Sequence, residues 1–365
     1  MKVLFLTNIP SPYRVDFFNE LGKYCDLTVT FEGKNATDRD DKWKAANEYN
    51  FKAVYLNGFR VSSDKFFCID ILKILNKEWD TIIIGGYSTP TAILAIEYLK
   101  FKKKKFFIEA DGGFIGNDNW LKYKIKKHLI SSASWWFTSG NETTKYLVYY
   151  GAKKEKCFWY PFTSIKEEDL ENAAKLKQID KSKLKRKLCI KEDIVLLAVG
   201  RFIKLKAYDV LMKSTKELPK NIGIYIVGGE PPKEYKKLKT LYQLNNLHFV
   251  EFKTKNELAY YYAIADIFIH PTRSDVWGLV INEAMTFGLP IITTEKCIAG
   301  LELVDNKNGA IIPVDDVESL KKAINNILNS NIAEKGNISF KRIKQYTIEN
   351  MAKAHIDILV KVKND

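Results

Sequence analysis

The sequence has 365 residues, of which 46% are hydrophobic, and its formal net charge is +14. This length favours two domains of roughly 170 residues each, and the apolar content excludes a largely disordered chain. No apolar run approaches the roughly 20 residues of a membrane span. The first residues predict a buried strand rather than a signal peptide, so we expect a cytoplasmic protein.

Cysteine and histidine are too scattered to indicate a metal site. No Cys-x-x-C spacing occurs, and buried free thiols in a reducing compartment are the expected state. The four histidines are equally dispersed. The five cysteines are Cys25, Cys68, Cys157, Cys189 and Cys297.

The positive charge comes from lysine, because arginine occupies only seven positions. Lysine clusters occur at Lys102–Lys105 and between Lys122 and Lys127, the second beside Trp120 and Tyr123. These clusters fit either an ordinary solvated surface or attraction to an anionic membrane or anionic acceptor. Scarce arginine and the lack of a recognised motif argue against nucleic acid as a partner.

The first half alternates short apolar runs with amphipathic segments, which predicts a parallel sheet covered by helices. We assign residues 1–165 to this domain and expect a helix at about 345–365 to pack back on it. The expected strands are Val3–Leu6, Leu27–Phe31, Thr81–Ile84, Phe106–Ile108 and Trp135–Thr138. The expected helices are Tyr13–Leu21, Thr89–Leu99 and Glu142–Tyr150.

A charged stretch, Glu167–Lys187, separates the halves and is interpreted as the interdomain connection and lead-in to a second domain, residues 166–344. The strand and helix pattern then restarts. The expected strands are Ile194–Val199, Gly223–Val227, Leu247–Phe252, Ile267–His270 and Pro290–Thr293. The expected helices are Tyr208–Leu218, Lys233–Leu244, Glu257–Ala265 and Leu279–Phe287.

A strand order of 3-2-1-4-5 in the second half would make its first and fourth strands neighbours. Ligands of such sheets bind beyond the carboxyl ends of the strands, where the order reverses. This predicts binding chemistry just after Val199 and just after His270. After Val199, Gly200 permits a tight turn, and Arg201 and Lys206 flank a loop that enters a helix. Two cations beside a helix N-terminus could hold a diphosphate, although a surface loop with ordinary lysines is the alternative.

After His270, Asp275 precedes an expected helix whose N-terminal N–H groups can bind phosphate oxygens, and Gly278 would let the ligand approach closely. Glu283 lies roughly 12 Å farther along the helix axis, at about 1.5 Å per residue. A nucleotide-sugar fits this spacing, with its sugar at Asp275 and its ribose at Glu283. A capping aspartate and a solvent-facing glutamate are the alternative. The expected N–H donors are Val276, Trp277, Gly278 and Leu279.

The segment resembles the acidic pair, separated by seven residues, of retaining glycosyltransferases of family 4. That family shows a glutamate at both positions, then a helix of small residues and a Gly-x-Pro turn. Here Asp275 replaces the first glutamate, whereas the later residues follow the pattern. The residues that carry the resemblance are Glu283-Ala284-Met285, Gly288-Leu289-Pro290, Gly200-Arg201 with Lys206, the glycine turn Gly228-Gly229-Glu230-Pro231, and Gly309 to Pro313, which looks like the family's turn before the next helix.

The resemblance implies an α/β protein with the GT-B fold, in which two doubly wound Rossmann-like domains face each other across a cleft. The first domain would bind the acceptor and the second the donor. Asp275 would bind donor-sugar hydroxyls and Glu283 the nucleotide ribose. Arg201 and Lys206 would stabilise the departing diphosphate. The implied reaction is retaining hexose transfer from a UDP-sugar to a glycan or lipid-linked acceptor in surface polysaccharide synthesis, at the inner face of the membrane.

The first half departs from the family, which often carries an N-terminal glycine-rich loop and a histidine near the reaction centre. The first loop, Asn8–Arg14, has no glycine, and His128 lies in a lysine-rich segment. We place Asp111 in the neighbourhood of the missing histidine, where it could orient the donor sugar or the acceptor. A glycine-aided turn with a solvated aspartate is the alternative. Tyr13 and Arg14 follow the first strand and are expected to contact the acceptor. For Arg14, contact with the diphosphate and a local role at the start of the helix are the alternatives.

The triplet Asp38-Arg39-Asp40 has the Asp-x-Asp spacing of metal-dependent sugar transferases with a different fold. It falls in a polar loop rather than after a buried strand, so we expect no required metal or other cofactor. Two rival functions share the expected nucleotide-sugar site. One is a nucleotide-sugar 2-epimerase of the same fold, and the other is a non-catalytic nucleotide-sugar-binding protein.

Overall fold

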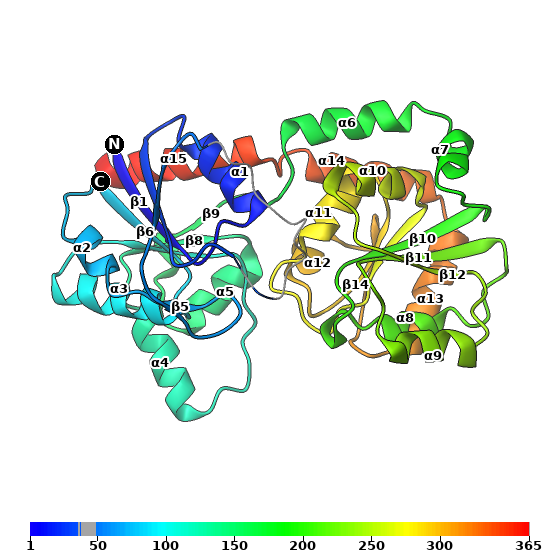
Figure 1. The fold of residues 1–365 in the computed structure, drawn as a ribbon, viewed down its shortest axis with the longest axis horizontal. Helices are drawn as coiled ribbons and strands as arrows, with labels where there is room; N and C mark the ends of the chain where they lie inside the picture. Colours follow the sequence, from blue (N-terminus) through cyan, green and yellow to red (C-terminus); the bar gives the residue numbers. More distant parts are fainter. Residues whose placement is uncertain (36, 38–48, 365) are drawn as a thin grey trace. The chain divides into compact units, whose positions relative to one another are not determined.

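The computed structural model describes residues 1–35, 37 and 49–364. The chain divides into two compact units, the first formed by Met1–Ser164 with Thr347–Asp365 and the second by Ile165–Tyr346. Each unit is built on its own parallel sheet with helices on both faces (Figure 1). This confirms the predicted α/β class with two Rossmann-like halves.

The first unit holds a seven-stranded parallel sheet in the order β3-β2-β1-β6-β7-β8-β9. Its strands are β1 Lys2–Thr7, β2 Asp26–Phe31, β3 Lys52–Tyr55, β6 Thr81–Gly85, β7 Phe107–Ala110, β8 Trp135–Thr138 and β9 Cys157–Trp159, beside a small hairpin of β4 Phe59–Arg60 and β5 Phe66–Phe67. Its helices are α1 Pro12–Leu21, α2 Ile71–Leu75, α3 Pro90–Phe101, α4 Trp120–Ile130, α5 Asn141–Tyr149 and α15 Ile348–Asn364, with a 3₁₀ turn η1 at Lys154–Lys156. Helix α15 packs against α1, so the end of the chain completes this unit.

The central strands form because their residues are almost all apolar and are buried on both faces of the sheet. In β1 every residue after Lys2 is buried. Helix α3 begins where Thr89 Oγ1 accepts a hydrogen bond from Ala92 N at 3.0 Å, with Pro90 in the first turn, where its missing N–H costs nothing.

The second unit holds a six-stranded parallel sheet in the order β12-β11-β10-β13-β14-β15. Its strands are β10 Ile194–Val199, β11 Ile222–Val227, β12 Leu247–Val250, β13 Ile267–His270, β14 Ile291–Thr294 and β15 Gly309–Ile312. Its helices are α6 Glu167–Lys177, α7 Lys181–Lys187, α8 Tyr208–Ser214, α9 Lys233–Leu241, α10 Lys255–Ile264, α11 Leu279–Thr286, α12 Ile298–Leu303, α13 Val317–Leu328 and α14 Ile332–Ile343, with a 3₁₀ turn η2 at Lys204–Lys206. The predicted neighbours β10 and β13 are paired, which confirms the expected reversal of strand order between them.

Two stretches of the second unit add to what the sequence predicted or correct it. Glu167–Lys187 is mostly helical, and its helices α6 and α7 pack against α10. The expected turn at Gly309–Pro313 was wrong, since Gly309–Ile312 pairs with β14 as the edge strand β15. A Cβ atom at Gly309 would lie 1.9 Å from the Ile291 carbonyl oxygen, so the glycine serves close strand approach rather than a turn.

Candidate functional site

Two loops meet where the strand order reverses in the second unit. One follows β10 and includes η2, and the other follows β13 and leads to α11. The Arg273 N–H donates to the Leu205 carbonyl at 2.7 Å, and Thr272 Oγ1 donates to the same carbonyl at 2.8 Å. The loop that bears Lys206 is therefore fixed to the loop that bears Asp275.

The side chain of Arg273 strengthens this junction. Its Nη1 donates to the Lys204 carbonyl at 2.6 Å, and its Nη2 and Nε pair with Asp209 and Asp315, each at 2.7 Å. Hydrogen bonding to Asp209 is the main reason that the pKa of Arg273 lies above its usual value. No role of its own was predicted for Arg273, although the rarity of arginine in a lysine-rich chain was a usable signal.

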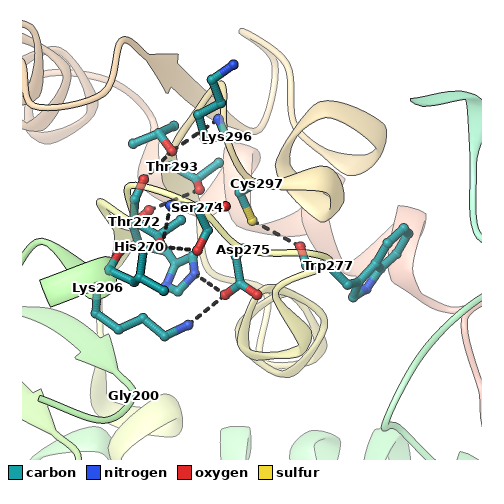
Figure 2. A network of polar contacts seen from close by, with 12 residues as sticks. Gly200, Lys206, His270, Thr272, Ser274, Asp275, Trp277, Thr293, Lys296 and Cys297 are labelled. Atoms are coloured by element: carbon teal, nitrogen blue, oxygen red, sulfur yellow. Dashed lines mark hydrogen bonds and ion pairs between the residues drawn. The ribbon is translucent and has the colours of Figure 1, made fainter. Parts of the chain in front are cut away.

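Lys206, Asp275 and His270 form one contact cluster at the carboxyl ends of β10 and β13 (Figure 2). Asp275 Oδ2 lies 2.6 Å from Lys206 Nζ and 2.9 Å from His270 Nε2. Burial raises the pKa of Asp275, but the His270 hydrogen bond and the Lys206 charge outweigh it and hold the pKa below its usual range. The cluster thus presents an ionised carboxylate, about 20% exposed, beside a lysine ammonium.

His270 was expected only as the end of a strand, but its side chain is completely buried within the cluster. An ionised carboxylate only accepts hydrogen bonds, so Nε2 must carry the proton that it shares with Asp275. Burial lowers the pKa of His270, and the Lys206 charge lowers it further against the opposing effect of Asp275. A polar residue that ends an otherwise apolar strand was the signal for this position.

Glycines let the backbone pack closely around the cluster. Gly200 has φ of +146°, and its carbonyl accepts a hydrogen bond from Tyr208 Oη at 3.0 Å. A Cβ atom at Gly228 would lie 1.8 Å from the Gly200 oxygen, so only glycine fits there. The turn at Gly200 and the glycine turn at Gly228 therefore lie against each other. Arg201 follows Gly200 and is half-buried.

The helix after Asp275 begins at the predicted residue, Leu279. Gly278 adopts a left-handed conformation with φ of +101° and caps α11, which starts at Leu279. Val276 and Trp277 therefore precede the helix, and the expected run of helical N–H donors from Val276 was wrong. The Trp277 side chain is buried, and its Nε1 donates to Asn282 Oδ1 at 2.8 Å, so this side chain supports the turn.

Glu283 lies on α11 outside the Lys206–Asp275–His270 cluster. Tyr262 Oη donates to Glu283 Oε2 at 2.8 Å, and both side chains line a pocket of about 50 Å³. This volume is well below the roughly 300–1,000 Å³ of pockets that enclose a whole small molecule. The pocket therefore offers room for only part of a ligand. Its remaining lining residues are Ile165, Asp169, Asn172, Lys255, Asn256, Leu258, Ala259, Thr286 and Phe287.

In the first unit, Arg14 and Asp111 belong to a buried ionic network. Arg14 pairs with Glu109 and, at 2.5 Å, with Asp111. Tyr160 Oη donates to Asp111 Oδ1 at 3.1 Å, and His355 Nε2 lies 3.0 Å from Glu109 Oε2. Asp111 is thus not the solvated turn residue of the alternative interpretation. Burial raises the pKa of Asp111, as does Glu109, whereas Arg14 lowers it.

The contacts of Arg14, Tyr13 and His128 do not indicate that these side chains bind a ligand directly. Arg14 is buried between two carboxylates, which supports a role in holding Asp111 and does not support direct contact with an acceptor. Tyr13 is half-buried and packs edge-on against Phe162, with ring centroids 5.8 Å apart. His128 lies on α4, where its Nε2 is 2.6 Å from Glu97 Oε1.

The triplet Asp38-Arg39-Asp40 lies outside the described residues. Across residues 1–35, 37 and 49–364, no group of three or more His, Cys, Asp or Glu side chains is arranged to hold a metal ion. The free cysteines include Cys297, whose Sγ donates to the Trp277 carbonyl at 3.1 Å beside the cluster (Figure 2).

Comparison with known proteins places these features in a known fold. Residues 180–349 match the family model described as Glycosyl transferases group 1. The crystal structure of Anabaena Alr3699/HepE in complex with UDP has a TM-score of 0.77 and 15% identity, over 99% of this chain and 100% of that one. The chain therefore has the fold of GT-B glycosyltransferases.

Curated relatives match this chain over less than half of their own length. An uncharacterized glycosyltransferase of Haemophilus influenzae is 31% identical over 153 residues, which cover 40% of this chain and 42% of that protein. The lipopolysaccharide glucosyltransferase WaaG of Escherichia coli is 31% identical over 123 residues, 32% of each chain. The chain thus spans less than half the length of these relatives, and the matches support a glycosyltransferase.

Proposed function

We propose that the protein is a retaining glycosyltransferase of family 4 that transfers a hexose from a UDP-sugar to a glycan or lipid-linked acceptor in surface polysaccharide synthesis. The observation that carries this proposal is the Lys206–Asp275 pair at the reversal of strand order. It joins a cation suited to a departing diphosphate with a carboxylate suited to sugar hydroxyls. The UDP complex of the Anabaena protein and the glucosyltransferase relative support the donor and pathway class.

In the proposed reaction, the bond between the anomeric carbon and the diphosphate breaks as the acceptor hydroxyl attacks. Negative charge then grows on the diphosphate oxygens, where Lys206 and Arg201 stabilise it. A cation that is already held in place in a partly buried site does not have to be reoriented as the charge develops. This preorganisation is the main reason that it lowers the energy of the transition state. The acceptor proton leaves with the diphosphate, and no protein nucleophile or metal cofactor is part of the proposal.

The proposed nucleoside contact is Glu283, which Tyr262 orients through the hydrogen bond to Oε2. Replacing Glu283 with alanine removes the acceptor of the ribose hydroxyls, so we expect UDP and UDP-sugar to bind about tenfold more weakly. Isothermal titration calorimetry with UDP measures this loss. The control is Glu318→Ala, which removes an exposed carboxylate from α13 of the same unit and is expected to bind UDP normally.

A panel of UDP-, GDP- and ADP-sugars, scored by thermal stabilisation and then by turnover, tests the function as a whole. A bound donor at 100 times its Kd stabilises by about 2.7 kcal/mol. We expect selective stabilisation by a UDP-sugar and release of UDP only when a glycan acceptor is present. Donor conversion without an acceptor would indicate an epimerase, and stabilisation without turnover in the presence of diverse acceptors would indicate a binding protein.

Helix α4 is the proposed contact with an anionic membrane surface. It lies at the periphery of the first unit (Figure 1), and it exposes Trp120 by 73%, Leu121 by 60% and Ile125 by 49%. Lys124 lies 5.8 Å from the Trp120 ring centroid, whereas Lys122 and Lys126 are paired with Asp118. Exposed apolar side chains interleaved with lysines suit binding within the headgroup layer. Among the described residues, the helices are all too short or too polar to span a bilayer.

Replacing both Trp120 and Leu121 with alanine removes the largest apolar contacts of this surface. We expect at least a tenfold loss of binding to vesicles that contain anionic lipid, measured by flotation. The matched control is Leu241→Ala, which removes a 70% exposed leucine from α9 and is expected to leave flotation unchanged. Equal flotation of the wild-type protein with neutral and anionic vesicles would contradict the membrane proposal.

A further inference from the structure

We propose that His270 is a positioning residue, which holds Oδ2 of Asp275 so that Oδ1 faces the sugar of the donor. The inference rests on the proposed function, because it assigns the donor sugar to Asp275. His270 itself makes no contact with the donor in this proposal. It acts only through the geometry and charge of the carboxylate.

The contacts of Asp275 are divided unequally between its two carboxylate oxygens. Lys206 Nζ and His270 Nε2 both bind Oδ2. Figure 2 shows Oδ1 turned away from both partners. The backbone around Asp275 is also fixed, since its N–H donates to the Lys296 carbonyl at 2.8 Å. The carboxylate is therefore held at one oxygen and presents the other.

The burial of His270 argues against a purely structural role. Its Nδ1 is buried and has no hydrogen-bond partner among the described residues. A buried acceptor without a partner costs free energy, and an apolar side chain would avoid that cost at the end of this apolar strand. The hydrogen bond from His270 Nε2 to Asp275 offsets the cost of burying Nδ1 without a partner. The strand around it is fixed, since Thr293 Oγ1 donates to the His270 carbonyl at 3.0 Å.

The arrangement also explains why Asp275 needs a second partner besides Lys206. In the free protein the ammonium group of Lys206 pairs with Asp275. A bound donor diphosphate would compete with Asp275 for that ammonium group. When Lys206 turns towards the diphosphate, His270 still donates to Oδ2 and keeps the carboxylate in place. Lys206 can then serve the diphosphate without releasing Asp275 from its position.

Two substitutions at His270 separate positioning from packing. His270→Gln retains an N–H donor close to the position of Nε2, whereas His270→Leu retains the bulk and loses the donor. We expect His270→Leu to bind UDP-glucose about tenfold more weakly and UDP with unchanged affinity, measured by calorimetry. His270→Gln is expected to restore UDP-glucose binding to within about threefold of wild type. The selective loss and the rescue by glutamine are results that a packing role does not produce.

The controls keep this outcome distinct from failure of the proposed function. If His270→Leu does not fold, His270→Asn, whose shorter amide does not reach the Nε2 position, is expected to show the same selective loss. Equal weakening of UDP and UDP-glucose, or wild-type affinity for both in the leucine or asparagine variant, would overturn the role of His270. Failure of the wild-type protein to bind either ligand would instead overturn the proposed function.

Discussion

Replacing Lys206 with alanine is expected to lower kcat by about 10²- to 10³-fold and to change the KM for the donor much less. The reason is that the diphosphate gains negative charge as its bond to the sugar breaks, so the ammonium stabilises the transition state more than the bound donor. Loss of one preorganised electrostatic contact of this kind costs about 3–4 kcal/mol of transition-state stabilisation. Steady-state UDP release, measured with the best donor and acceptor, gives both constants.

The matched control is Lys204→Ala, in the same 3₁₀ turn. Lys204 is exposed, and Arg273 binds its backbone carbonyl rather than its side chain, so the turn stays in place. We expect activity within twofold of wild type for this variant. A Lys206→Ala enzyme that folds and retains wild-type kcat would show that Lys206 does not stabilise the leaving group.

The largest effect on stability is expected at Glu109, whose side chain is completely buried between Arg14 and His355. Replacing Glu109 with glutamine leaves the Arg14 charge buried with only Asp111 to balance it. Breaking a buried ion pair on one side costs about 3–5 kcal/mol. At about 2–4 °C per kcal/mol, the first unit should melt roughly 10 °C lower. Thermal unfolding of the first unit can be measured by tryptophan fluorescence, because every tryptophan except Trp277 belongs to that unit.

The same network predicts a pH dependence of stability. Burial raises the pKa of Glu109, but Arg14 and His355 outweigh it and lower the pKa from 4.5 to about 2. The stabilisation from ionised Glu109 is therefore complete above pH 4.5 and is lost as the pH falls from 4.5 towards 2. The difference in unfolding free energy between wild type and Glu109→Gln should shrink over that range in urea titrations.

A matched control for the Glu109 variant is Lys145→Ala, which breaks an exposed pair with Glu142 on α5. Exposed pairs of this kind contribute about 0–1 kcal/mol, so the melting temperature should hardly move. A Glu109→Gln protein with wild-type stability at neutral pH would show that the network contributes nothing to the fold.

The sequence was most informative where strands are buried on both faces. Strands β10 and β13 begin and end at the predicted residues, because a parallel sheet covered by helices requires continuous apolar runs. The neighbouring position of these strands followed from the general rule for doubly wound sheets, and it placed Lys206 and Asp275 in one region before any contact was known. The edge strand β15 escaped prediction because its glycine and short length also describe a turn.

Contacts between distant residues could not be predicted from the sequence. Arg14 is 95 residues from Glu109, and Glu109 is 246 residues from His355, which reaches it from the C-terminal helix. No local pattern records such a pairing. Arg273 and His270 were overlooked for a related reason, because their roles depend on which backbone and side chain lie opposite them. The left-handed conformation of Gly278, which places Val276 and Trp277 ahead of α11, is permitted by the sequence but not required by it.

Hydrogen–deuterium exchange with and without saturating UDP-glucose tests the central claim most directly, namely that a nucleotide-sugar binds where β10 and β13 end. We predict slower exchange in residues 200–207 and 272–283, no change in α4, and loss of the protection in an Asp275→Asn, Lys206→Ala double variant. If calorimetry shows binding but the protected amides lie elsewhere and both loops exchange as in the free protein, the site assigned here is contradicted.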